Sequence, residues 1–433
     1  MTQLEKAVKG EATREIETVA TAEGQPAELV MERVAEGQIV IPANERRRGK
    51  IIGIGRGLRT KINASIGSST AIADVAMEVE KAKIAEKYGA HTLMDLSVGG
   101  DIQGIRKAVM DAVSLPVGTV PLYEAFALAI ERYGAAVKMP AELLFEVTEK
   151  QCGEGVGFMA IHCGINRRTI EMLRNQHYRY GGLVSKGGAY LVAWMERNNK
   201  ENPLYEHFDR VVEILKSHDT VLSLGNGFRA GAIDDATDRV QVQELLINCE
   251  LAQIGRDAGC QTMVEGPGHV PINEIEANII MEKKMSGGSP FYMLGPITTD
   301  IAPGHDHITA AIGAALSSSY GADFICYVTP SEHLGLPFPE DVREGVVASR
   351  IAAHIGDMIK YKDTRADKEM SKARRDMRWD KQLAIAIDPE RMQEIRAKRG
   401  ESDNDSCTMC GKFCANNILR GAFEASMEGT DKK

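Results

Sequence analysis

The sequence predicts an α/β fold, a (β/α)₈ barrel of the TIM type, and three observations support this prediction. Short runs typical of β-strands recur from about residue 61 to residue 330, and most end in small or polar residues. Amphipathic stretches with helical spacing of apolar residues lie between most of these runs, most clearly at 71–88 and 240–258. Strands that alternate with helices indicate parallel βαβ units, and eight or nine units in about 270 residues suit a barrel of roughly 250 residues.

An open, doubly wound parallel sheet is the alternative architecture. No G-x-G-x-x-G motif follows a first strand with an acidic residue about 20 positions later, so a dinucleotide-binding fold has no support. The predicted strands, in chain order, lie at 61–66, 91–97, 116–120, 157–162, 220–224, 262–265, 291–295 and 322–329, with a weaker one at 182–185.

The chain has more residues than one barrel requires, and the surplus divides into three flanking parts. Residues 1–58 form an N-terminal helical and extended segment, and residues 59–350 form the barrel. Residues 351–400 form a helical module with expected helices at 346–361 and 368–387, and a third begins at Asp388 with Pro389 at its first position. Residues 401–433 form a flexible tail that carries three cysteines.

Composition excludes several classes of protein. Lys and Arg total 52 against 61 Asp and Glu, a net charge of −9, which argues against nucleic acid or an anionic membrane as the main partner. No apolar run approaches the roughly 18 residues of a membrane span, and the charged start lacks the apolar stretch of a signal peptide. We therefore expect a cytoplasmic protein whose eight cysteines are reduced thiols or metal ligands.

The strongest local signal is the tail motif Cys407-x₂-Cys410-x₃-Cys414. Three thiols within eight residues of a flexible tail are not expected to be buried core residues. They would occupy three corners of a [4Fe–4S] cluster and leave one iron open for a small molecule. An open iron of this kind is where S-adenosylmethionine binds in radical enzymes, so the motif points to radical chemistry. Zinc, which would need a fourth ligand, and free thiols are the alternatives.

Polar residues recur where the predicted strands end, and active sites of such barrels lie at the C-terminal ends of the strands. Glu265-Gly-Pro-Gly-His269 follows one strand and His333 follows the last, so two imidazoles could hold one divalent metal. The alternative is that each histidine is only a hydrogen-bonded structural residue. Two glycine-rich loops, 185–188 and 225–229, each carry one cation and suit a phosphate monoester, although both could equally be ordinary turns.

These residues resemble the phosphomethylpyrimidine synthases, the thiamine pyrimidine synthase family of radical S-adenosylmethionine enzymes. The resemblance extends from Ile39 to Cys414 and rests on the motifs at 94–97 (Met-Asp-Leu-Ser), 162–164 (His-Cys-Gly), 265–271 and 332–335 (Glu-His-Leu-Gly). It implies a (β/α)₈ barrel followed by a helical region, in homodimers whose cysteine tail serves the partner's barrel. The implied reactants are aminoimidazole ribotide and S-adenosylmethionine, with a [4Fe–4S] cluster, one divalent metal (zinc or iron) and an external electron donor.

Site residues follow from the same resemblance. The implied metal ligands are His269 and His333, the cluster ligands are Cys407, Cys410 and Cys414, and Glu265 is the expected proton-transfer group. The implied substrate-contacting positions are Ser65, Met94, Tyr123, His162, Ser185, Lys186, Gly187, Asn226, Gly227, Phe228, Arg229, Glu265 and Tyr292.

Three departures from the thiamine enzymes fall in the substrate loops. Their usual Asn-Ala-Asn, Ser-Arg-Gly and Asp-Gly-Leu-Arg are replaced here by residues that include Ser65, Lys186 and Asn226. Ser65 lacks the paired donor and acceptor of an amide, Lys186 is a point charge rather than a fork, and Asn226 removes a carboxylate. We therefore favour the related anaerobic 5-hydroxybenzimidazole synthases, which make the lower ligand of a cobamide (vitamin B12 type) from the same ribotide as radical carbon–carbon lyases. A phosphomethylpyrimidine synthase is the alternative, and a non-catalytic iron- or redox-sensing barrel is a more remote one.

Overall fold

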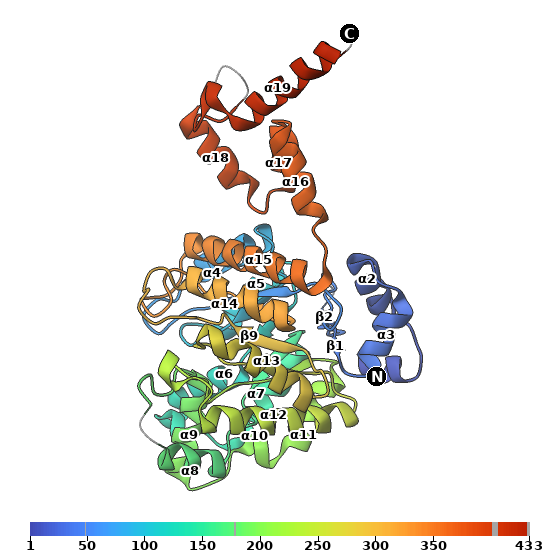
Figure 1. The fold of residues 1–433 in the computed structure, drawn as a ribbon. Helices are drawn as coiled ribbons and strands as arrows, with labels where there is room; N and C mark the ends of the chain where they lie inside the picture. Colours follow the sequence, from blue (N-terminus) through green and yellow to red (C-terminus); the bar gives the residue numbers. More distant parts are fainter. Residues whose placement is uncertain (48, 177–178, 401–405, 431–433) are drawn as a thin grey trace. The chain divides into compact units, whose positions relative to one another are not determined.

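A computed structural model describes residues 1–47, 49–176, 179–400 and 406–430. The chain forms two compact units, Met1–Tyr361 and Lys362–Lys433, and each is described by itself (Figure 1). The four domain bounds expected from the sequence stay a prediction, although the unit boundary falls inside the expected helical module.

The first unit contains a closed barrel of eight parallel strands, which confirms the predicted fold class. The last strand pairs with the first through Phe324 and Lys61 and with its predecessor through Phe324 and Tyr292, so the sheet has no free edge. The strands are β3 (Lys61–Ile66), β4 (Thr92–Asp95), β5 (Val117–Thr119), β6 (Phe158–Ile161), β7 (Val221–Leu224), β8 (Thr262–Glu265), β9 (Phe291–Leu294) and β10 (Phe324–Cys326).

The prediction of a weak strand at 182–185 is wrong. These four residues form a loop, and Ser185 caps the next helix with a side chain that accepts from the Gly188 N–H. The local reason is that a serine followed by Lys-Gly-Gly suits a helix start better than an extended strand.

The barrel interior is filled rather than hollow. Phe158 and Phe324 are completely buried, and their rings pack edge to face with centroids 6.0 Å apart. Gly118 on β5 makes room for this packing, since a Cβ there would lie 2.3 Å from the Phe158 ring. These rings fill part of the barrel interior, and a cavity remains at the C-terminal ends of the strands.

Helices connect the strands and cover the barrel (Figure 1). The predicted helices at 71–88 and 240–258 are confirmed as α4 and α12, the former starting later because Asp74 caps it. The full set is α4 (Val75–Lys87), α5 (Ile102–Ala112), α6 (Pro121–Tyr133), α7 (Ala141–Gly153), α8 (Arg167–Asn175), α9 (Lys186–Asn198), α10 (Pro203–Glu206), α11 (Phe208–Ser217), α12 (Arg239–Asp257), α13 (Ile272–Met285), α14 (Asp306–Tyr320) and α15 (Pro339–Tyr361), with short 3₁₀ turns η1 (Ala136–Lys138) and η2 (Ile233–Asp235).

The N-terminal segment lies against the N-terminal ends of the barrel strands. It comprises α1 (Gln3–Val8), α2 (Arg14–Glu23), α3 (Ala27–Ala35) and the antiparallel pair β1 (Ile39–Val40) and β2 (Ile54–Gly55), with an apolar cluster of its own. The Thr2 hydroxyl donates to the Gly259 carbonyl at 2.7 Å, and the Ile41 N–H donates to Gln261 Oε1 at 2.7 Å. Both partners directly precede β8, so the segment covers the end of the barrel away from the expected active site.

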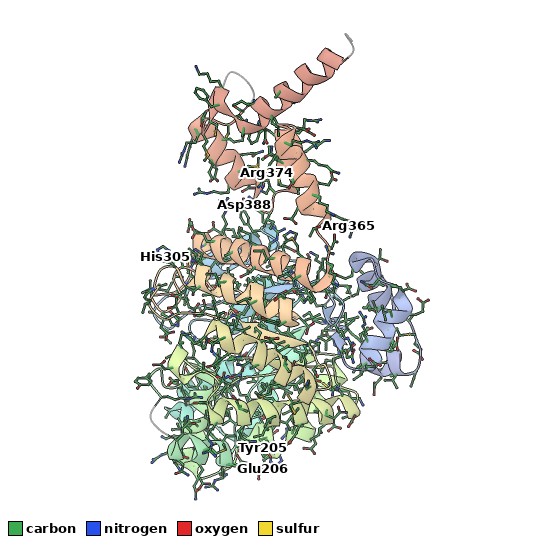
Figure 2. All side chains as sticks on the ribbon, viewed as in Figure 1. Tyr205, Glu206, His305, Arg365, Arg374 and Asp388 are labelled. Atoms are coloured by element: carbon green, nitrogen blue, oxygen red, sulfur yellow. The ribbon has the colours of Figure 1, made fainter. Side chains whose placement is uncertain are left out.

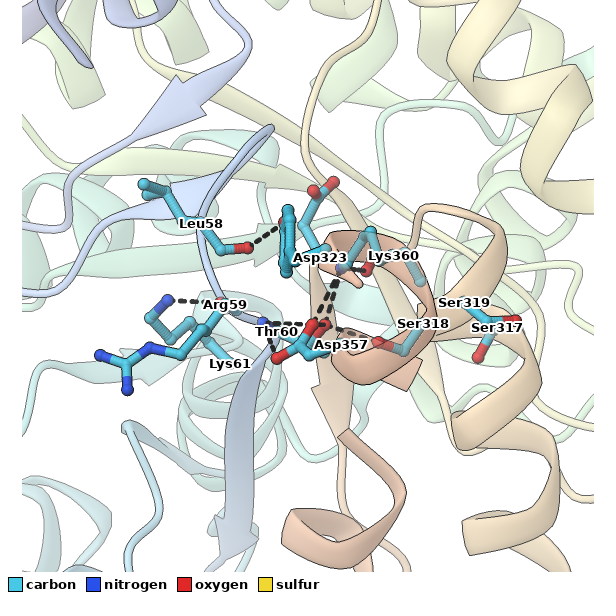
Figure 3. Close-up of polar contacts among 12 residues, drawn as sticks. Leu58, Arg59, Thr60, Lys61, Ser317, Ser318, Ser319, Asp323, Asp357 and Lys360 are labelled. Atoms are coloured by element: carbon cyan, nitrogen blue, oxygen red, sulfur yellow. Dashed lines mark hydrogen bonds and ion pairs between the residues drawn. The ribbon is translucent and has the colours of Figure 1, made fainter. Parts of the chain in front are cut away.

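A polar network also ties α15 to the start of β3 (Figure 3). The Thr60 N–H and hydroxyl both donate to Asp357, the hydroxyl at 2.7 Å, and the Thr60 and Ser318 hydroxyls lie 2.6 Å apart. Lys360 donates to the Thr60 hydroxyl at 2.8 Å and lies 3.3 Å from the Asp357 carboxylate. The last barrel helix is thereby fixed to the first strand.

The second unit consists of α16 (Arg365–Arg375), α17 (Trp379–Ile385), α18 (Pro389–Arg399), the 3₁₀ turn η3 (Gly411–Phe413) and α19 (Ala415–Thr430). The predicted single helix at 368–387 is broken between α16 and α17, because Met377 takes a left-handed φ of 54°. The predicted start at Asp388 is confirmed, since its carboxylate caps α18 (Figure 2). Sequence reasoning did not find α19, which follows the cysteines.

Of the predicted tail, residues 401–405 and 431–433 lie outside the described residues. Within the described parts of the chain, no helix is both long and apolar enough to cross a lipid bilayer.

Candidate functional site

A cavity with both polar and apolar lining residues opens at the C-terminal ends of the barrel strands, where the sequence places the site. Seven of the predicted substrate-contacting residues line it together, although they come from different strands and connections. They are Ser65, Met94, Tyr123, His162, Arg229, Glu265 and Tyr292. The other predicted residues lie beside it. The expected glycine-rich loop at 185–188 is instead the cap and first turn of α9, whereas 225–229 is a loop as expected.

His162 joins the cavity to the N-terminus of α9. Its Nε2 lies 3.2 Å from the Ser185 hydroxyl, and a Cβ on Gly187 would lie 2.3 Å from the imidazole, so only glycine fits there. Burial, with a smaller effect of the Arg229 charge, lowers the pKa of His162 to about 3. The ring is therefore neutral near pH 7, and its Nδ1 has no hydrogen-bond partner among the described residues. Such an imidazole can hydrogen-bond a ligand without adding a charge.

Buried side chains from outside the cavity fix the loop at 225–229. Glu244 on α12 accepts from two successive N–H groups, those of Gly227 at 2.8 Å and Phe228 at 2.7 Å. Asn248 donates to the Gly225 carbonyl at 3.1 Å, and Arg179 donates to the Phe228 carbonyl at 2.8 Å. Burial raises the pKa of Glu244 to about 7, against the opposing effect of the two N–H bonds. These hydrogen bonds fix the backbone of the loop, and so they fix the positions of Asn226 and Arg229.

Sequence reasoning missed Glu244 as a site residue. The available signal was an acid on the apolar face of an amphipathic helix, between Val240 and Leu245. A carboxylate is rarely fully buried without a partner, so such a position indicates a specific contact elsewhere in the fold.

Asn226, Arg229 and Glu265 meet at the same side of the cavity. Glu265 accepts from the Ser223 hydroxyl at 2.7 Å, and the Asn226 N–H points to its other oxygen at 3.4 Å. Desolvation raises the pKa of Glu265, an effect that the Ser223 bond and the Arg229 charge oppose. The Asn226 amide is 1% exposed and neither of its polar atoms has a partner among the described residues; the same holds for Nε of Arg229. Unpaired buried polar groups cost free energy, so these donors and acceptors are available to hydrogen-bond a ligand.

A smaller network lies next to this group, on the neighbouring strands β9, β10 and β3. Asn63 donates to the Tyr292 hydroxyl at 2.7 Å, and the Ser65 hydroxyl lies 3.2 Å from the Cys326 thiol. Burial raises the pKa of both Tyr292 and Cys326, so both are protonated at neutral pH. Cys326 also belongs to the cavity lining. Lys186 is exposed beside the cavity, with its ammonium 5.6 Å from the centre of the Tyr123 ring.

The two predicted metal ligands lie beside each other. The rings of His269 and His333 are 5.1 Å apart between centroids. Nδ1 of His269 lies 2.7 Å from Asp300, and Nδ1 of His333 lies 3.6 Å from Asp306. Burial lowers the pKa of His269, so its ring is neutral and its Nε2 can act as a ligand. No set of three His, Cys, Asp or Glu side chains converges as a metal site anywhere in the described residues. His269 and His333 would therefore supply two protein ligands to a metal.

The three tail cysteines lie on two successive turns. Cys407 and Cys410 are exposed and Cys414 is half-buried, with none in a disulfide. Gly411 donates its N–H to the Cys407 carbonyl, and η3 separates Cys410 from Cys414. Accessible thiols that are close in sequence and unconstrained by a core suit the ligands of an iron–sulfur cluster.

These features define a (β/α)₈-barrel enzyme with a cavity at the strand ends and a segment that carries three cysteines. The chain belongs to the radical SAM ThiC family, whose sequence model matches residues 2–421. Membership implies a [4Fe–4S] cluster and S-adenosylmethionine.

Relatives with two different names resemble the chain over nearly its whole length. A protein of Desulfuromonas acetoxidans named 5-hydroxybenzimidazole synthase is 59% identical over 430 residues, or 99% of each chain. One of the same name from Geobacter sulfurreducens is also 59% identical over 430 residues and 99% of each chain. A protein of Methanoculleus marisnigri named phosphomethylpyrimidine synthase is 58% identical over 423 residues, covering 98% of this chain and all of the relative.

Proposed function

We propose that this chain is a 5-hydroxybenzimidazole synthase, a radical carbon–carbon lyase that rearranges 5-aminoimidazole ribotide. The observation that carries the proposal is the match at 59% identity, over 99% of both chains, to relatives with that name. The cavity supports it, because its lining combines a cation, a carboxylate and an unpaired imidazole, and the unpaired amide of Asn226 lies in an adjoining loop. These groups suit a phosphorylated heterocycle.

Substrate binding would use the N-terminus of α9 and the loop at 225–229. Arg229 and the N-terminus of α9 at Ser185 would hold the phosphate, because a guanidinium and helix N–H groups both favour an anion. Asn226 and Nδ1 of His162 would then satisfy their unpaired atoms on the polar edge of the ligand. Tyr123, Met94 and Tyr292 supply apolar walls for a flat ring.

Glu265 would move protons during the rearrangement. Its raised pKa brings the carboxyl closer to neutral pH, where a group can both accept and release a proton. Ser223 holds one oxygen, so the orientation of the carboxyl is fixed before substrate arrives.

Cys407, Cys410 and Cys414 would hold the [4Fe–4S] cluster, and His269 and His333 would hold one divalent metal, zinc or iron. When bound, the reduced cluster supplies the electron that cleaves S-adenosylmethionine. We also propose a cytoplasmic homodimer in which the tail serves the partner's barrel, with an external electron donor.

An anaerobic assay of the reconstituted protein with ribotide and S-adenosylmethionine, followed by product separation, tests the proposal. We expect fluorescent 5-hydroxybenzimidazole, and its absence together with a pyrimidine phosphate would contradict it. Replacing the three tail cysteines with alanine should remove both turnover and the iron–sulfur absorbance.

A phosphomethylpyrimidine synthase is the second candidate, because relatives with that name are 56–58% identical over almost the whole chain. The same assay separates the two candidates, since each has a different product from the same ribotide.

A further inference from the structure

Asp300 lies in the connection from β9 to α14 and uses both of its carboxylate oxygens. Oδ1 lies 2.7 Å from Nδ1 of His269, and Oδ2 accepts from the backbone N–H of Ile233 at 2.8 Å. The two partners belong to different connections, one after β8 and the other after β7. One side chain therefore spans two loops of the site.

The loop that contains Ile233 leads to the predicted phosphate-binding residues. Ile233 begins η2, and Asp235 in the same turn accepts from the N–H groups of Tyr180 at 2.9 Å and Gly181 at 2.7 Å. The two backbones are in contact, since a Cβ on Gly181 would lie 2.4 Å from the carbonyl carbon of Gly231. From Gly181 the chain runs directly to Ser185, the cap of α9.

In the other direction, the same loop runs back to Arg229 and Asn226. Glu244 accepts from the N–H groups of Gly227 and Phe228 in that part of the loop, and Asp300 accepts from the N–H of Ile233 farther along the chain. The start of α9 and the residues at 226–229, which form the proposed ribotide site, are therefore connected through the backbone segment that Asp300 holds at Ile233.

We propose that Asp300 is a positioning residue for two sites at once: it orients His269 for a metal and holds the β7 loop for substrate. The inference rests on the proposed function, because it takes His269 as a metal ligand and the loop as a ribotide site. A carboxylate suits this task because it accepts two N–H groups in different directions, whereas an amide has one oxygen to offer.

Asp300 also allows a clean substitution. Its side chain is 39% exposed, so removing it leaves no unpaired charge in a core. Asp234 provides a matched control, because it lies in the same turn η2 and is exposed.

The test compares Asp300→Ala, Asp300→Asn and Asp234→Ala in the full-length protein. Zinc affinity is measured by competition with a chromogenic chelator, and ribotide affinity by calorimetry on metal-free protein. We expect Asp300→Ala to weaken zinc about 10–100-fold and ribotide about 5-fold, with Asp300→Asn between it and wild type. Asp234→Ala should stay within about twofold of wild type in both. An Asp300→Ala protein that loses zinc affinity alone, or neither affinity, would overturn the double role.

Hydrogen exchange separates failure of this inference from failure of the proposed function. If wild-type protein does not bind ribotide, the proposed function fails, but the loop can still be followed in the free protein. The Ile233 N–H should exchange faster in Asp300→Ala than in wild type or Asp234→Ala. Equal exchange in all three proteins would show that Asp300 does not hold the loop.

Discussion

Two polar clusters at opposite ends of the barrel differ in how their buried polar atoms are paired. At the N-terminal end of β3, Thr60, Ser318, Asp357 and Lys360 satisfy one another in a closed network (Figure 3). At the C-terminal end, polar atoms of His162, Asn226 and Arg229 have no partner in the part of the chain that the structure describes. Buried polar side chains gather at both places, and they differ in whether their polar atoms are paired.

The difference teaches what each end contributes. A buried polar group without a partner costs about 1–3 kcal/mol, whereas a paired one contributes about 1 kcal/mol. The paired cluster at the N-terminal end therefore stabilises the barrel. The unpaired donors and acceptors at the C-terminal end are available to hydrogen-bond a ligand. Substitutions at the N-terminal end should change stability but not ribotide binding, whereas substitutions at the C-terminal end should change ribotide binding.

The largest effect is expected at the N-terminal end. Asp357→Ala removes the acceptor of the Thr60 N–H and the counter-charge of Lys360, which should lower the free energy of unfolding by about 3 kcal/mol. Ribotide affinity of the folded protein should stay within about twofold. Urea unfolding measures the first quantity, and Asp111→Ala, which removes an exposed ion pair with Lys107, serves as a control with no measurable change expected. A weakened ribotide affinity in Asp357→Ala would break the comparison.

A smaller effect concerns stability against pH at the C-terminal end. The pKa of His162 is about 3 in the folded chain and about 6.5 when unfolded, so only the unfolded chain gains a proton as pH falls below 6.5. This stability contribution is therefore present above pH 6.5 and is lost toward pH 3. Between pH 7.5 and 5.5, His162→Gln should lose about 1.4 kcal/mol less stability than wild type. Identical losses in urea unfolding would show that His162 is not held neutral.

The smallest effect is expected behind the cavity. Glu244→Gln keeps the size of the side chain but offers one acceptor oxygen to the two N–H groups of Gly227 and Phe228. We expect the KM for ribotide to rise about 5-fold, close to 1 kcal/mol, with little change in kcat. Glu250→Gln, on the exposed face of the same helix, is the control. A fall in kcat with unchanged KM would mean that Glu244 does not act through the loop.

The sequence predicts the barrel and its cavity well because both depend on local pattern. Alternating strands and helices identify the eight strands, and the ends of those strands bring Ser65, Arg229 and Glu265 together in any such barrel. Glu244 and Asp300 escape prediction because their partners are backbone N–H groups on other connections, which no spacing reveals.

Two local errors have the same kind of cause. The run at 182–185 has strand-like residues, but capping by Ser185 determines its conformation. The helix expected at 368–387 has continuous helical character, but a left-handed residue at Met377 divides it. In both cases a specific backbone feature, a helix cap or a left-handed residue, determines the local structure in place of the residues' intrinsic propensity.

The most direct test of the central claim is ribotide titration by calorimetry on wild type, Arg229→Ala and Asp357→Asn. The central claim is that the unpaired polar groups at the C-terminal end of the barrel bind the phosphorylated substrate. We expect wild type and Asp357→Asn to bind within about twofold of each other, and Arg229→Ala to bind about 30-fold more weakly, close to 2 kcal/mol for a charge-assisted contact. Wild-type affinity in Arg229→Ala, or an equal loss in Asp357→Asn, would contradict the claim.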